Sequence, residues 1–161
     1  MGVEIERKFL VIGDEWRDLA DGIDYRQGYL CTVKERTVRV RTVGERGYLT
    51  VKGISVGAVR AEFEYEIPRE DADQMLDDLC ERPLIFKTRY TIPFRGHVWE
   101  VDDFHLENEG LVVAEVELSD PDERFDIPPW IGEEVTGDPR FFNANLIAHP
   151  YSVWGDEQSA G

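Results

Sequence analysis

The chain has 161 residues, of which 42% are hydrophobic and 11% aromatic, a length and composition that suit one domain and exclude wholesale disorder. Eighteen lysines and arginines stand against 34 acidic residues, which gives a formal net charge of −16. A surface field of that sign repels nucleic acid and anionic membranes, so we expect neither as a partner.

The sequence composition also indicates the cellular compartment. No apolar run approaches the roughly 20 residues of a membrane-spanning helix. The first residues are acidic almost at once and lack the basic-then-apolar order of a secretory signal. Cys31 and Cys80 are far apart and belong to no metal-binding motif, so we expect neither a disulfide framework nor a zinc site. We therefore expect a cytoplasmic protein, either a monomer or a homodimer.

In chain order, most predicted elements are strands. The two-residue alternation typical of strands runs through eight segments, at 3–11, 25–32, 37–43, 48–53, 60–67, 86–93, 97–104 and 111–118. Helical spacing predicts a short helix near 15–20 and a longer one over 69–82. Asp138 and Pro139 form a helix start, which predicts a helix from there to about Ala148. We expect one domain over 1–155 and a flexible tail over 156–161.

The alternation places charged side chains on one face of these strands and apolar side chains on the other. In the first strand Glu4, Glu6 and Lys8 share a face. The charges are sorted by strand into E-x-E pairs and an R-x-R pair, whereas a solvated face is usually a mixture of polar types. An open antiparallel sheet with one wet face is the simple interpretation. Eight strands are also enough to close a barrel with a charged interior.

A charged interior favours a particular ligand. Grouped arginines and lysines require an oxyanion, and grouped carboxylates require a hard divalent cation such as Mg²⁺ or Mn²⁺. A polyphosphate that carries metal ions satisfies both groups. The chain has no G-x-x-x-x-G-K-[ST] motif, which excludes an ordinary P-loop nucleotide site.

The charged strands also resemble a known family. Residues 4–8, Glu-Ile-Glu-Arg-Lys, are similar to the E-x-E-x-K signature of the CYTH superfamily, the triphosphate tunnel metalloenzymes. Further motifs of that family follow in order at 27–30, 39–41, 49–53, 60–64, 87–90, 99–102 and 110–118. The resemblance covers nearly the whole chain. It implies an α+β fold, mainly antiparallel β, in which eight strands form a closed tunnel with a charged lumen and flanking helices.

The resemblance is greatest to short bacterial inorganic triphosphatases, which hydrolyse tripolyphosphate to pyrophosphate and phosphate with Mg²⁺ or Mn²⁺. It implies that the substrate is held by Lys8, Arg39, Arg41, Lys52, Arg60, Lys87 and Arg89. It implies that metal is held by Glu4, Glu6, Glu62, Glu64, Asp102, Glu115 and Glu117. Lys8 and Tyr29 match the pair that accepts the proton of the attacking water in such enzymes. A carboxylate such as Glu4 or Glu6 is the competing base.

Three other functions stay open at this point. A thiamine triphosphatase or a broader nucleoside triphosphatase would use the same fold and mechanism. A non-catalytic module that binds polyphosphate or an organophosphate would need the cations but not the carboxylates. A scaffold with a solvated charged sheet would have no phosphate affinity. The tryptophans and the segment around Phe141 and Leu146 are expected to pack in the core or against the tunnel.

Overall fold

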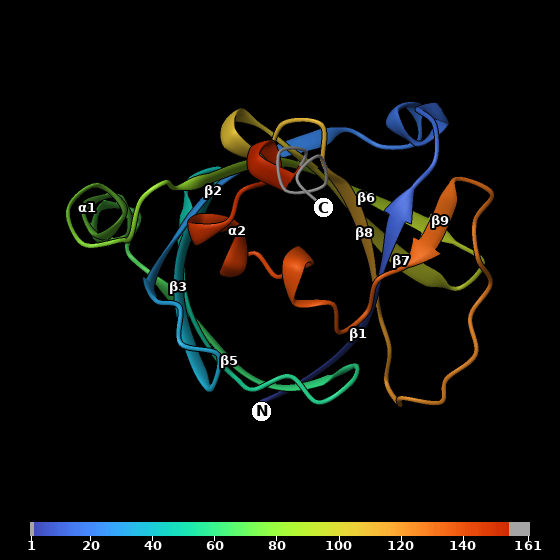
Figure 1. Cartoon of the computed structure of the whole chain (residues 1–161), viewed down its shortest axis with the longest axis horizontal. Coiled ribbons are helices and arrows are strands. Elements are labelled where there is room, and N and C mark those ends of the chain that lie inside the picture. Colours follow the sequence, from blue (N-terminus) through green and yellow to red (C-terminus); the bar gives the residue numbers. More distant parts are fainter. Residues whose placement is uncertain (1, 155–161) are drawn as a thin grey trace.

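Eight antiparallel strands form a closed barrel in the computed structural model, which describes residues 2–154 (Figure 1). The barrel strands are β1 Val3–Val11, β2 Gly22–Cys31, β3 Arg36–Val43, β4 Arg46–Gly53, β5 Val59–Ile67, β6 Ile85–Phe94, β7 His97–Phe104 and β8 Val112–Glu117. Neighbours follow the order β5-β4-β3-β2-β6-β7-β8-β1, and β1 returns to pair with β5. The predicted eight-stranded tunnel is confirmed. The predicted tail, 156–161, lies outside the described residues.

Strand β1 closes the barrel. Its first residues pair with β5, from Val3 opposite Ala61 to Ile5 opposite Val59. Its later residues pair with β8, beginning at Glu6 opposite Glu117. One strand thus joins the two edges that the other seven strands would leave open, and barrel closure of this kind removes free sheet edges.

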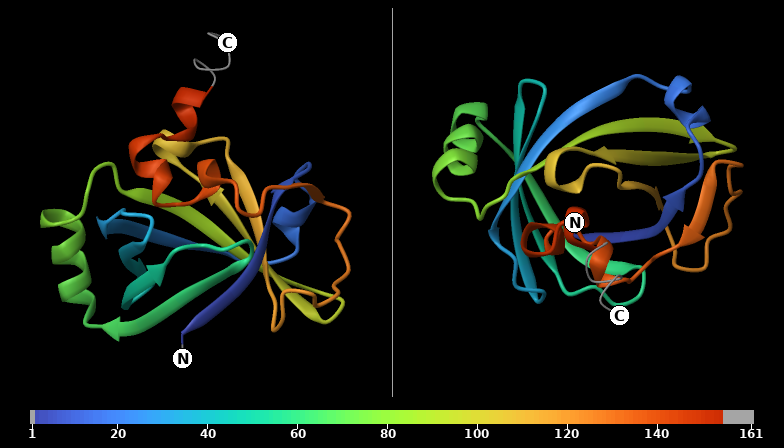
Figure 2. Two further views of the ribbon diagram at one scale, coloured as in Figure 1. Left: turned by 60° about the horizontal axis from the view of Figure 1, so that its bottom comes forward. Right: turned by 45° about the horizontal axis from the view of Figure 1, so that its top comes forward.

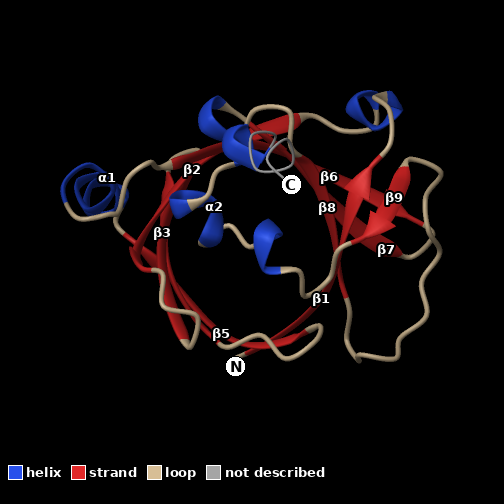
Figure 3. Ribbon diagram, in the orientation of Figure 1, coloured by secondary structure: helices blue, strands red, loops and turns tan. Residues whose placement is uncertain are grey.

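The helical segments lie outside the wall or across one mouth of the barrel (Figure 3). They are η1 Glu15–Asp18, α1 Arg69–Asp78, η2 Leu106–Asn108, η3 Pro139–Phe141, α2 Asn145–Ala148 and η4 Tyr151–Val153. Helix α1 packs on the outer surface of β2, β3 and β4. Within residues 2–154, no helix is long and apolar enough to cross a membrane.

Two expectations from the sequence are wrong. A ninth strand, β9 Ile131–Glu134, pairs with the end of β1 and was not predicted. The helix expected over 138–148 is broken into η3 and α2. Asp138 does cap this segment, since its side chain accepts a hydrogen bond from the backbone N–H of Arg140. The helix nevertheless stops at Phe142, whose ψ of 128° is extended. This break lets the chain turn into the barrel mouth.

The hydrophobic core lies mostly outside the barrel, as the sorted strand faces predict. One cluster gathers Trp16, Trp99 and Trp130 against the outer faces of β1, β7 and β8. A second places Leu76 of α1 over Val40 of β3. Because the apolar face of each strand is turned outward, the inward face is free to carry charge.

A third cluster closes one mouth. Residues 135–148, here called the covering segment, cross that mouth and continue to η4 (Figure 2). Their buried side chains include Phe141 and Leu146, and the Phe141 ring meets Trp154 edge-on at 5.2 Å between centroids. The expectation that this segment plugs or flanks the tunnel is therefore met, although by turns and one helical turn rather than by a continuous helix.

Candidate active site

The lumen holds a polar cavity of about 290 Å³, and every barrel strand contributes side chains to its lining. The predicted cations all line it: Lys8, Arg39, Arg41, Lys52, Arg60, Lys87 and Arg89. Of the predicted metal ligands, the cavity is lined by Glu4, Glu6, Glu62, Glu64, Glu115 and Glu117. Tyr29 also lines it, while Asp102 lies behind the lining. Period-two alternation thus brings residues from distant parts of the chain to one cavity.

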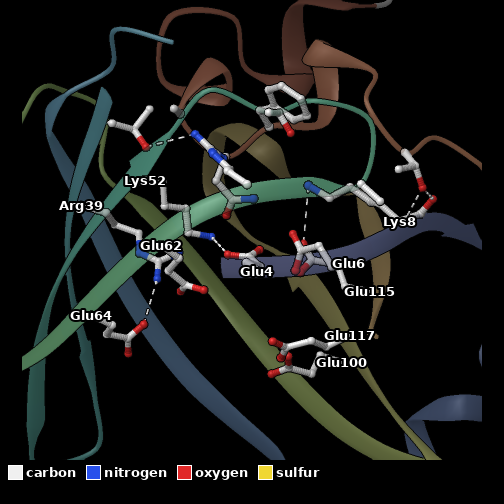
Figure 4. Close-up of a pocket in the computed structure, with 18 of the residues that line it drawn as sticks. Glu4, Glu6, Lys8, Arg39, Lys52, Glu62, Glu64, Glu100, Glu115 and Glu117 are labelled. Atoms are coloured by element: carbon white, nitrogen blue, oxygen red, sulfur yellow. Dashed lines mark hydrogen bonds and ion pairs between the residues drawn. The ribbon is translucent and has the colours of Figure 1, made fainter. Parts of the chain in front are cut away.

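Carboxylates of β1 and β5 form one acidic group in the lumen (Figure 4). Burial would raise the pKa of Glu4, but Lys52, whose Nζ lies 2.8 Å from Oε2, and hydrogen bonds from Glu6 and Glu62 hold that pKa far below its usual range. Burial and the nearby Glu115 and Glu4 raise the pKa of Glu6 well above its usual range. Burial and Glu4 raise the pKa of Glu62 to about 7. Neighbouring carboxylates therefore retain protons at neutral pH.

A second acidic group continues along β7 and β8. Glu100 lies opposite Glu115 in the β7–β8 register, and Glu117 lies opposite Glu6. Burial opposes ionisation of Glu115, but Lys8 and Arg89 lower its pKa to about 2. Burial, Glu4 and Glu100 raise the pKa of Glu117. The two groups meet at Glu6.

The donor chemistry of these groups fits a hard divalent cation. All the donors are carboxylate oxygens, and their mutual repulsion is the kind that such a cation relieves. Within residues 2–154, no three acidic, histidine or cysteine side chains converge closely enough to hold a metal ion by themselves. Mg²⁺ is commonly bound by one or two carboxylates together with substrate phosphates. The lumen is therefore suited to a metal ion that arrives with a phosphate ligand.

Arginines of β3 carry unpaired N–H donors beside Glu64 of β5. Arg41 Nη2 lies 3.3 Å from Glu64 Oε1, and Arg39 Nη2 lies 3.7 Å from Glu64 Oε2. The Nε atoms of both arginines are buried without a hydrogen-bond partner in the described structure. Burial and the neighbouring Arg39 lower the pKa of Arg41. Paired guanidinium groups with unused N–H donors are suited to phosphate oxygens.

Asp102 holds two further cations from behind. Its Oδ1 accepts from Arg89 Nε at 2.7 Å, and its Oδ2 accepts from Lys87 Nζ at 2.7 Å and from Arg89 Nη2 at 2.9 Å. Burial lowers the pKa of Lys87 to about 8 despite this carboxylate. Both oxygens of Asp102 thus accept hydrogen bonds from Lys87 or Arg89. If Asp102 also binds a metal ion, one of these oxygens must serve the metal ion and a side chain together.

Lys8 and Tyr29 face the same cavity near the covering segment. Lys8 Nζ donates to the backbone oxygen of Phe141 at 3.2 Å and lies 3.5 Å from Glu115 Oε1. Within residues 2–154, these groups and not the Tyr29 hydroxyl are the polar partners of the ammonium. The pair is therefore placed in one cavity but is not hydrogen-bonded.

Some lining residues were not among the predicted site residues. Glu100 shares its strand face with Asp102, so alternation alone could have found it. Tyr25 places its ring beside the guanidinium of Arg89, at 4.9 Å from its centroid. Asn143 enters from the covering segment, where no periodicity signals an inward side chain.

Comparisons with known proteins agree with this geometry. Residues 2–151 match the CYTH domain family. An inorganic triphosphatase of Acetivibrio thermocellus is 56% identical over 151 residues, which span 94% of this chain and 97% of that protein. An inorganic triphosphatase of Nitrosomonas europaea is 37% identical over 148 residues, 89% of this chain and 95% of that protein. A crystal structure of an inorganic triphosphatase matches with a TM-score of 0.64 at 33% identity, covering 89% of this chain and 96% of that one.

Proposed function

The chain belongs to the CYTH domain family, and from that membership we propose that it hydrolyses inorganic triphosphate to pyrophosphate and phosphate within its barrel. The relatives that cover nearly its whole length are inorganic triphosphatases. The enzyme is thus a hydrolase of phosphoanhydride bonds.

One observation of the structure supports this proposal most. The same cavity is lined by seven cations, which a triphosphate anion would neutralise, and by six predicted acidic metal ligands. Phosphoryl transfer depends mainly on positioning and on neutralising charge, and both are available there. A module that only bound polyphosphate would have no use for the carboxylates.

The divalent cation would bind among Glu4, Glu6, Glu62, Glu64, Glu115 and Glu117, one or two of which would coordinate it together with substrate phosphates, with Asp102 as a shared ligand. Mg²⁺ or Mn²⁺ bound there would neutralise phosphate charge and acidify water. The predicted substrate cations would hold the phosphate oxygens in the lumen.

The remaining step is proton acceptance from the attacking water. We assign it to Tyr29 acting as the phenolate, whose oxygen takes the proton of the water and becomes a hydroxyl, with the Lys8 ammonium lining the same cavity. The protein's part is then to hold the attacking water and the terminal phosphorus in line with the P–O bond that breaks to release pyrophosphate, and to accept the proton of the water at the phenolate oxygen of Tyr29. Glu4 is committed to Lys52, which makes it a poorer base.

Phosphate release from tripolyphosphate, thiamine triphosphate and ATP, each with Mg²⁺, Mn²⁺ or EDTA, tests the proposal. We expect metal-dependent release chiefly from tripolyphosphate. Release chiefly from an organic triphosphate would replace it with a thiamine or nucleoside triphosphatase. No release from folded protein would favour a binding module.

A further inference from the structure

The covering segment contributes to the cavity as well as closing its mouth. Phe142, Asn143 and Ala144 line the same space as the phosphate-binding cations. The Phe142 ring lies 5.6 Å from Lys8 Nζ, measured to its centroid. Asn143 is the one among these three whose side chain carries hydrogen-bonding groups.

Two donors fix the orientation of the Asn143 amide. Its Oδ1 accepts from Gln27 Nε2 at 2.9 Å and from Lys87 Nζ at 3.1 Å. An NH₂ group cannot accept hydrogen bonds, so these donors determine which end of the amide is oxygen. The Nδ2 group therefore stands at the other end, as a neutral donor beside a cavity lined largely by charged groups.

The partners of Asn143 are themselves held firmly. Gln27 has no exposed surface. Lys87 is nearly as buried, and its Nζ also donates to Asp102 Oδ2 at 2.7 Å. An ammonium has three N–H bonds. Because Asp102 and Asn143 each take one, the third N–H of Lys87 has its direction set by both.

We propose that Asn143 is a substrate-binding residue: Nδ2 donates to an oxygen of the triphosphate at the covered mouth, and Oδ1 directs Lys87 toward the same end of the substrate. The inference rests on the proposed function, because it supplies the triphosphate. It assigns to the covering segment a polar contact with the substrate in addition to its packing role.

Two substitutions separate this contact from simple charge effects. Asn143→Asp keeps oxygen acceptors for Gln27 and Lys87 but removes the N–H donor. Asn143→Ala removes the donor without adding a negative charge. Arg140→Ala is the matched control, since Arg140 lies in the same segment but is exposed and pairs with Asp138 at 2.8 Å.

The first measurement is tripolyphosphate binding in EDTA by titration calorimetry. The second is KM and kcat with Mg²⁺, beside a thermal unfolding curve. We expect both Asn143 variants to bind tripolyphosphate about tenfold more weakly or worse, as for a lost hydrogen bond to a charged group. KM should rise more than kcat falls, and the control should match the wild type.

The outcomes distinguish this inference from the proposed function. Equal binding by wild type and Asn143→Ala overturns it, and so does weakening by Asn143→Asp alone, which would show charge repulsion only. Wild-type protein that does not bind tripolyphosphate overturns both. Wild-type protein that binds without hydrolysis, while both variants bind more weakly, overturns the function and supports the Asn143 contact. Asn143→Leu, which has a similar shape and no donor, replaces the alanine variant if that protein does not fold.

Discussion

Tyr29 combines burial with access to the lumen, since its exposed fraction is 5% and it still lines the cavity. If its phenolate oxygen accepts the proton of water, Tyr29→Phe removes the base while keeping the packed ring. We expect kcat to fall by about 100-fold or more, the usual range for general base catalysis, with little change in KM.

Steady-state phosphate release measures this effect. Tyr151→Phe is the control, because that ring packs on Trp154 at 5.0 Å between centroids and lies outside the cavity lining. Full turnover by Tyr29→Phe would transfer the role of base to a carboxylate.

Asp102 was predicted as a metal ligand, but in the structure both of its oxygens accept hydrogen bonds from Lys87 and Arg89. Removing its charge leaves Lys87 and Arg89 buried with an incomplete counter-charge. Because breaking a buried ion pair from one side is costly, we expect Asp102→Asn to lower the free energy of unfolding by about 3 kcal/mol. Denaturant unfolding in EDTA measures it.

The neighbouring Asp103→Asn supplies the comparison. Asp103 pairs with Arg17 at 2.8 Å at a partly exposed site, where an ion pair contributes about 1 kcal/mol or less. Equal losses in the two variants would contradict the buried-network account. Normal stability together with weakened Mg²⁺ binding would make Asp102 chiefly a metal ligand.

At the scale of elements, β2 meets the connection between α1 and β6 at Gly28 without room for a side chain. A Cβ there would lie 2.7 Å from Leu84 Cδ2 and 2.9 Å from Cys80 Cβ. We expect Gly28→Ala to displace the connection that holds Cys80 and Leu84 and to destabilise the protein by about 1–3 kcal/mol, as overpacking does.

Thermal unfolding is the measurement, with Gly53→Ala as a control in β4. A Cβ at Gly53 meets only Ala61 Cβ at 3.4 Å, an ordinary contact. If both variants unfold at the wild-type temperature, the packing of Gly28 against Cys80 and Leu84 is looser than these distances indicate.

The elements also show how far the sequence could be read. The barrel strands were predictable because each carries long alternation, as in Glu4, Glu6 and Lys8. Strand β9 was missed because four residues that include Gly132 give too little pattern. Asn143 was missed because the sequence predicts a continuous helix there. The extended backbone at Phe142 ends that helix before Asn143, and no periodic pattern indicates this change. Alternation placed Asp102 on the inward face but could not show that cations stand in front of it.

For the whole molecule, the lumen carboxylates make stability depend on pH. Glu62 has a folded-state pKa of about 7 against an ordinary 4.5, and the pKa values of Glu6 and Glu117 are also raised. A raised carboxylate pKa contributes stability that is complete below the unfolded pKa and is lost as pH rises through the folded pKa. We therefore expect the metal-free protein to unfold at a higher temperature at about pH 6 than at about pH 7.5, two values that lie on either side of the Glu62 pKa.

Thermal unfolding in EDTA across this window is the measurement. Glu62→Gln should flatten the pH dependence, because it removes one of the groups that titrate there. Added Mg²⁺ should stabilise the protein more at the higher pH, since carboxylates bind metal in the deprotonated form. A metal-free unfolding temperature that rises with pH would contradict the crowded-carboxylate account.

Because β1 closes the barrel, its place in the chain affects the order in which the strands can pair during synthesis. This strand precedes in the chain every strand with which it pairs, namely β5, β8 and β9. During translation it therefore waits for partners such as Glu117, which is far along the chain from Glu6. Because contacts between residues so far apart in the sequence cost more loop-closure entropy than local ones, we expect this pairing to form late in folding. Glu4, Glu6 and Lys8 lie on this strand. We therefore expect the lumen to acquire its full set of charged groups only when β1 closes the barrel.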